Sequence, residues 1–167
     1  RVLPASKAIP KEMMPVVDKP VIQHVVEEAV RAGIKEIILV TRNGKSAIED
    51  HFDKHYELEQ SLERKNKTAI LDSIRNIVPA DVTILSVRQP DALGLGHAVF
   101  CAAQAVNDEA FAVILPDVLV NNYQQDENDL QKMVSAFDQH NAAQIMVESV
   151  PQDKVHLYGI AACNDVK

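Results

Sequence analysis

The fold class of this 167-residue chain follows from one stretch, Pro20-Val-Ile-Gln-His-Val-Val-Glu-Glu-Ala-Val-Arg-Ala-Gly-Ile-Lys-Glu-Ile-Ile-Leu-Val-Thr41. In its first half, apolar residues recur every three or four positions, which predicts a helix that begins at Pro20 and stops at Gly33. Its second half, from Ile34 to Thr41, is a short apolar segment that predicts a buried strand. A helix that leads directly into a buried strand is typical of α/β proteins.

The same alternation continues on the carboxyl side of this stretch. Further strands are expected at residues 82–87, 111–115, 143–150 and 155–163, and helices at 45–52, 94–106 and 126–141. The charged segment 57–77 is expected to form one helix or a helix pair. Strands that alternate with helices of this length indicate βαβ units. We therefore expect an α/β protein with a Rossmann-like three-layer α/β/α fold and a mostly parallel central sheet.

Composition narrows the class of partner. The 47% apolar and 25% charged residues suit one globular domain. A formal net charge of −7 makes nucleic acid an unfavourable partner. The two cysteines, Cys101 and Cys163, are too few for a disulfide framework and fit a reducing cytoplasm. No apolar segment is long enough to span a membrane, so we expect no membrane partner.

On the amino side of the helix lies a basic, proline-rich segment, residues 1–15. It holds three cations, Arg1, Lys7 and Lys11, among three prolines. Prolines disfavour a helix, so the segment is expected to form a stiff, extended loop that holds cations, as a phosphate site requires. On charge alone, a solvated terminus is the simpler interpretation.

Two positions follow predicted strands, where ligands bind in parallel α/β sheets. Asp117 comes directly after the predicted strand 111–115 and Pro116, and its carboxylate suits Mg²⁺ or the cap of a turn. Gln89 and Gly94 lie in the loop after the strand 82–87. A glutamine amide matches the edge of a pyrimidine and a glycine allows close approach to a flat ring, although an ordinary loop would also contain both.

The glycines that follow do not indicate a dinucleotide site. Gly94 and Gly96 form a G-x-G pair, but Val99 stands where the G-x-G-x-x-G pattern needs its third glycine. His97 either orients a nucleotide or is an ordinary residue of a helix face. Gly159, inside the last predicted strand, is typical of a β-bulge.

Taken together, these motifs resemble the sugar-nucleotidyltransferase family. The family pattern places a leucine-proline pair and a lysine after an arginine, which correspond here to Arg1, Leu3-Pro4 and Lys11. The similarity continues through Asp18-Lys19-Pro20, Val87-Arg88-Gln89, Gly94-Leu95-Gly96-His97-Ala98, Ile114-Leu115-Pro116-Asp117-Val118, Gln144-Ile145-Met146-Val147-Glu148 and Tyr158-Gly159. It spans essentially the whole chain.

The resemblance implies a role for each candidate residue. Arg1 and Lys11 would be the catalytic cations on the triphosphate, and Asp117 would hold Mg²⁺. Gln89 and Gly94 would bind the base, with Gly96 and His97 beside the nucleotide. Gly159 would lie against the sugar. Glu12 would contact the nucleotide or orient Lys11.

The resemblance also implies an activity and a domain organisation. The activity is transfer of a uridylyl group from UTP to glucose 1-phosphate, which gives UDP-glucose and pyrophosphate. One alternative is the same fold acting on another pyrimidine nucleotide, such as dTTP, or on another sugar 1-phosphate. The other is a catalytically inactive regulatory paralogue. Residues 1–167 would be the nucleotide-binding part of one domain, truncated at both ends and inactive alone. The first strand and the carboxyl-terminal sugar-binding and oligomerisation part would be missing from this chain. The full-length protein would be a cytoplasmic dimer or tetramer.

Overall fold

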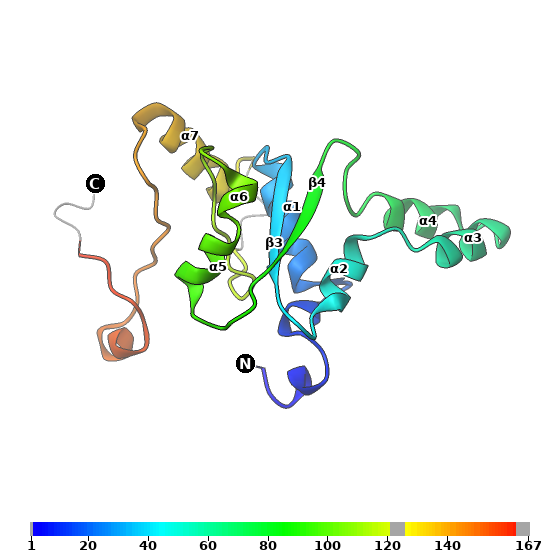
Figure 1. Ribbon diagram of the computed structural model, residues 1–167, viewed down its shortest axis with the longest axis horizontal. Coiled ribbons are helices and arrows are strands. Elements are labelled where there is room, and N and C mark those ends of the chain that lie inside the picture. Colours follow the sequence, from blue (N-terminus) through cyan, green and yellow to red (C-terminus); the bar gives the residue numbers. More distant parts are fainter. Residues whose placement is uncertain (1, 121–125, 163–167) are drawn as a thin grey trace.

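The computed structural model describes residues 2–120 and 126–162, and Figure 1 shows their arrangement. The strands are β1 (Pro15–Val16), β2 (Lys19–Pro20), β3 (Glu36–Thr41) and β4 (Thr83–Arg88). The α-helices are α1 (Val21–Arg31), α2 (Ser46–Phe52), α3 (Tyr56–Arg64), α4 (Thr68–Arg75), α5 (Leu95–Cys101), α6 (Ala103–Val106) and α7 (Asp129–His140). Short 3₁₀ helices are η1 (Ala5–Lys7), η2 (Lys11–Met13) and η3 (Gln152–Leu157).

The strands β3 and β4 form a parallel pair, which confirms the α/β class. Their register places Glu36 opposite Thr83 and Thr41 opposite Arg88. Two parallel strands need a crossover connection, and here α2, α3 and α4 supply it. Both strands therefore end at the same edge of the sheet. There the backbone N–H of Gln89 extends the ladder by donating to the Thr41 carbonyl at 2.8 Å.

The helix α1 forms as its sequence predicts and anchors the core. It ends before Gly33, whose φ of 88° is a conformation that glycine adopts without strain. Side chains two residues apart on a strand point to the same face. Leu39 accordingly packs from β3 against Ile22 of α1 and Ile48 of α2, all buried. The two helices thus cover one face of the sheet.

The helix α7 packs against α1 along a contact that we call the α1–α7 seam, formed by Ala29, Ala32, Asn128 and Leu130. Leu130 is buried against the two alanines. Asn128 is buried as well, and its side chain bonds to both helices. Its Oδ1 accepts from the Gln131 amide at 2.7 Å, which caps α7, and its Nδ2 donates to the Glu28 carbonyl at 3.0 Å.

The three strands expected beyond residue 108 do not form in the described chain. Residues 111–115 and 143–150 carry no strand, residues 155–157 belong to η3, and residues 158–162 are irregular; Cys163 lies outside the described residues. A strand requires a hydrogen-bonded partner, and the two sheets of the described residues each contain only two strands. Apolar side chains in these segments stay exposed, among them Phe111, Val113, Ile145 and Val147.

Two smaller features complete the fold. The charged segment expected as one helix or a helix pair is a pair, α3 and α4, because Asn66 turns the chain with a φ of 50°. This pair extends from the body of the molecule (Figure 1). Within the described residues, no helix has both the length and the apolar character needed to cross a bilayer.

Candidate active site

The amino-terminal segment differs from the extended loop that its prolines predict. It folds into η1 and η2, two single turns of 3₁₀ helix separated by a short link. In Figure 1 this segment, in dark blue, lies at the end of the sheet to which the loop between β4 and α5 also returns. The basic segment therefore lies at the carboxyl ends of the parallel strands, where α/β proteins bind ligands.

An ion pair between Lys11 and Asp117 joins this segment to a distant part of the chain. The Lys11 Nζ donates to Asp117 Oδ2 at 2.7 Å, although the two residues are 106 positions apart. Both side chains are partly accessible, 33% and 55% exposed. The hydrogen bond from the Lys11 ammonium holds the pKa of the Asp117 carboxyl below its ordinary value. Asp117 is therefore an anion at neutral pH and within reach of solvent.

A second polar group lies in the loop after β4. The Gln89 Nε2 donates to the Gly94 carbonyl at 3.1 Å and lies 3.1 Å from His97 Nδ1, which accepts in its Nε2–H tautomer. Gly94 precedes α5 with a φ of 95°, a conformation that favours glycine. The structure thus brings together three of the predicted residues, Gln89, Gly94 and His97. The Gln89 amide nitrogen makes both contacts, so its carbonyl oxygen takes part in neither.

The remaining predicted residues are placed differently. Glu12 is buried and pairs through its Oε1 with Lys45 Nζ at 2.7 Å, a lysine that sequence reasoning missed. Gly96 lies in the first turn of α5. The segment that carries Gly159, orange-red in Figure 1, runs outside the helices and away from β3 and β4. Arg1 lies outside the described residues. The position of Lys45, just after the strand β3 and Gly44, was the signal that could have identified it.

Asp117 has the chemistry of a single magnesium ligand. Mg²⁺ prefers oxygen ligands and is commonly held by one or two carboxylates together with substrate phosphates. Across the described residues, no group of three or more His, Cys, Asp or Glu side chains could hold a metal by itself. The exposed Asp117 carboxylate fits a metal that is shared with a phosphate ligand.

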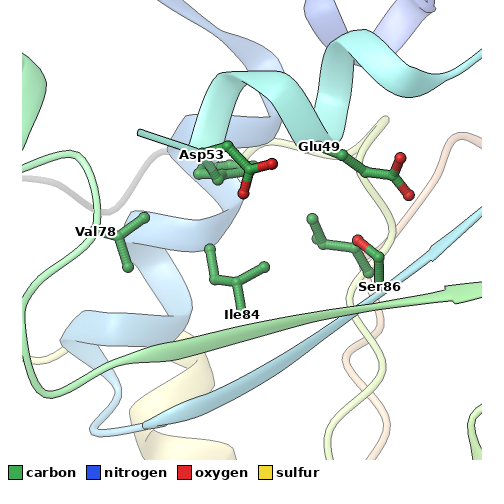
Figure 2. Close-up of a pocket in the computed structure, with 7 residues that line it drawn as sticks. Glu49, Asp53, Val78, Ile84 and Ser86 are labelled. Carbon is green, nitrogen blue, oxygen red and sulfur yellow. The ribbon is translucent and has the colours of Figure 1, made fainter. Parts of the chain in front are cut away.

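A separate hollow lies under α2. It has a volume of about 510 Å³ and lies between that helix and the sheet (Figure 2). Apolar side chains, among them Val78 and Ile84, line it together with Ser86 and the carboxylates of Glu49 and Asp53. None of the residues predicted for the site lines this pocket. Its carboxylates would repel a triphosphate, whereas the basic segment would attract one.

Comparison with known proteins points to one family. A family model described as nucleotidyl transferase matches residues 1–167. The UTP--glucose-1-phosphate uridylyltransferase of Haemophilus influenzae is 52% identical over the whole chain, and that of Escherichia coli K12 is also 52% identical. The chain covers 57% and 55% of these two relatives, so it spans little more than half of their length.

Solved structures give the same result. A structure described as UDP-glucose pyrophosphorylase from Acinetobacter baumannii is 51% identical and superposes with a TM-score of 0.92, covering all of this chain and 58% of that one. A structure described as UTP-bound UGPase from the same organism is 55% identical with a TM-score of 0.92, and the match covers 96% of this chain and 56% of that one. The predicted fold is thereby confirmed at the level of the whole chain.

Proposed function

Because the chain belongs to the nucleotidyl transferase family, we propose that it is the nucleotide-binding part of an enzyme that transfers a uridylyl group from UTP to glucose 1-phosphate. The products are UDP-glucose and pyrophosphate. The relatives that carry this activity in their names are about half identical to the chain, and one solved relative is described as UTP-bound.

The observation that carries the proposal is the ion pair between Lys11 and Asp117. A cation from the basic segment and an anion from a position 106 residues away meet at 2.7 Å, although each is accessible to solvent. Exposed pairs of this kind contribute little to stability, commonly less than about 1 kcal/mol. Their convergence is better explained by a ligand that needs both charges, and a nucleoside triphosphate with its metal is such a ligand.

The reaction asks the protein for position and charge rather than for a nucleophile. A phosphate oxygen of glucose 1-phosphate attacks the α-phosphorus of UTP, the bond from that phosphorus to the bridging oxygen of the β-phosphate breaks, and pyrophosphate leaves with the electron pair. Lys11 would neutralise charge that builds on the phosphate oxygens. Asp117 would hold Mg²⁺, which supplies further positive charge to the phosphates when it is bound. Arg1 is proposed as a second cation.

The Gln89 loop would hold the base. The side-chain nitrogen of Gln89 already bonds to Gly94 and His97. The side-chain oxygen of Gln89 is therefore the group that would accept from N3–H of uracil. Gly94, without a side chain, lets the ring approach the backbone. Gly96 would lie beside the nucleotide and Gly159 against the sugar. Thymine presents the same N3–H, so dTTP is the competing nucleotide.

Several further features belong to the same proposal. Residues 1–167 would form the nucleotide-binding part of a single longer domain. We propose a cytoplasmic location, which the presence of only two cysteines fits, and a homo-oligomer, dimer or tetramer. An inactive regulatory paralogue is the alternative, against which the presence of Lys11, Gln89 and Asp117 argues.

The deciding experiment measures pyrophosphate release by the intact protein that carries this chain. UTP with glucose 1-phosphate, in the presence of Mg²⁺, should give rapid release. Omission of Mg²⁺ should abolish it, and dTTP should be the poorer substrate. Release with dTTP but not UTP would replace the proposed nucleotide, and absence of release with either would favour the regulatory alternative.

A further inference from the structure

Lys45 has no role in the proposed reaction, although its ion pair with the buried Glu12 adjoins Lys11. Glu12 is 4% exposed, and its Oε1 accepts from Lys45 Nζ at 2.7 Å. The other carboxylate oxygen, Oε2, is buried without a hydrogen-bond partner in the part of the chain that is described. Burying a carboxylate that makes only one hydrogen bond costs free energy. Packing alone therefore does not explain a glutamate at this position.

The geometry of η2 connects this pair to Lys11. A 3₁₀ helix has about three residues per turn, so consecutive side chains point about 120° apart. Lys11 reaches out to Asp117, Glu12 points inward to Lys45, and Met13 packs against the core formed by Ile22, Leu39 and Ile48. The backbone that carries Lys11 is therefore held from below by one salt bridge and one apolar contact.

Lys45 is itself a fixed point. It precedes α2 as the capping residue, its carbonyl accepts from the Ile48 amide at 3.0 Å, and its side chain is only 25% exposed. The bond to Glu12 thus joins the segment before α1 to the start of the helix after β3. Lysine side chains are flexible, so the position of the Lys11 ammonium depends on how firmly its backbone is held.

We propose that Lys45, acting through Glu12, is a positioning residue that holds Lys11 where it meets the triphosphate. This inference rests on the proposed function. Removal of the Lys45 ammonium leaves Glu12 buried and unpaired, and η2 must shift to solvate it. Because a displacement of about 1 Å at a reacting group can cost on the order of 10²-fold in rate, the turnover should fall by roughly that factor.

The test first compares the intact enzyme with four variants. Lys45→Met should lower kcat on the order of 10²-fold, while Lys45→Arg, which can donate to both oxygens of Glu12, should stay within about threefold of the unaltered protein. Lys35→Met is the matched control, because Lys35 bonds Asp81 at 2.6 Å on the surface and far from η2 in the chain. It should leave kcat unchanged. Glu12→Gln combined with Lys45→Met removes both charges and serves if the single variant does not fold.

A role through Lys11 has one distinctive signature. In a Lys11→Ala background, Lys45→Met should cause no further loss of kcat, because the group that it positions is already gone. It should lower the unfolding midpoint by the same amount in both backgrounds. Multiplicative losses of kcat in the doubly altered enzyme, or normal kcat in folded Lys45→Met, would overturn the inference. If the unaltered enzyme releases no pyrophosphate, the proposed function is wrong. If the unaltered enzyme is active but the variants behave otherwise than predicted, only the positioning role of Lys45 is wrong.

Discussion

Two contacts join residues that are almost equally far apart in the sequence, but one is buried and the other is accessible to solvent. In the α1–α7 seam, Asn128 bonds Glu28 across 100 positions, and the donor is buried. In the candidate site, Lys11 bonds Asp117 across 106 positions, and both partners remain accessible. A buried polar contact supports the fold because its loss leaves unpaired groups without water. An accessible ion pair contributes little to the fold, and its groups can exchange partners when a ligand arrives.

Lys11→Ala should separate the two contacts most clearly. We expect kcat for pyrophosphate release to fall on the order of 10²- to 10³-fold, because one preorganised cation is lost from the transition state. The free energy of unfolding should change by less than about 1 kcal/mol, since the pair is accessible. Lys7→Ala, in the same basic segment, is the matched control and should keep its turnover. A large fall in the free energy of unfolding together with the fall in kcat would show that the pair of Lys11 and Asp117 supports the fold, as the buried contact does, and would contradict this distinction.

Leu130→Ala should give the reverse pattern. The side chain is 7% exposed and packs against Ala29 and Ala32, so its removal leaves a cavity in the seam. We expect the free energy of unfolding in urea to fall by about 2–4 kcal/mol, with kcat of the folded protein unchanged. Leu93→Ala, at a position that is 71% exposed, should cost less than about 0.5 kcal/mol. Equal losses at the two leucines would show that α7 does not dock as described.

Glu28→Gln should have the smallest effect and sharpen the account of the seam. Burial raises the pKa of Glu28 above its ordinary value, so the folded state holds the proton more tightly than the unfolded state. The ionised side chain therefore destabilises the fold at neutral pH, and this penalty disappears as pH falls below the unfolded pKa. We expect the amide to raise the free energy of unfolding by less than about 1 kcal/mol at pH 7 and by nothing in acid, as measured by urea titrations at both pH values.

The sequence correctly predicted elements whose packing or hydrogen-bonding partners lie among the described residues. The stretch from Pro20 to Thr41 formed its helix and its strand because apolar periodicity, a stop at Gly33 and a parallel partner in β4 all agree. The segments at 111–115 and 143–150 have equally apolar patterns, but a strand also needs a hydrogen-bonded neighbour, and periodicity cannot supply one. Exposed Phe111 and Ile145 record that difference.

The candidate site was predictable in its residue types but not in all of its contacts. Strand ends and the family resemblance made Lys11, Gln89, Gly94 and Asp117 candidates, and the structure joins them as two pairs. Glu12 was expected either to contact the nucleotide or to orient Lys11, but its burial against Lys45 was not predicted. The direction of a side chain on a single turn of 3₁₀ helix depends on what packs beneath that turn, and this information is spread over distant parts of the sequence.

The most direct measurement of the central claim is a structure of the intact protein with UTP and Mg²⁺ bound. The account predicts that the Lys11 ammonium leaves Asp117 and bonds a phosphate oxygen, while the Asp117 carboxylate binds the metal on the same phosphate chain. A triphosphate bound elsewhere, with the bond between Lys11 and Asp117 intact, would contradict it.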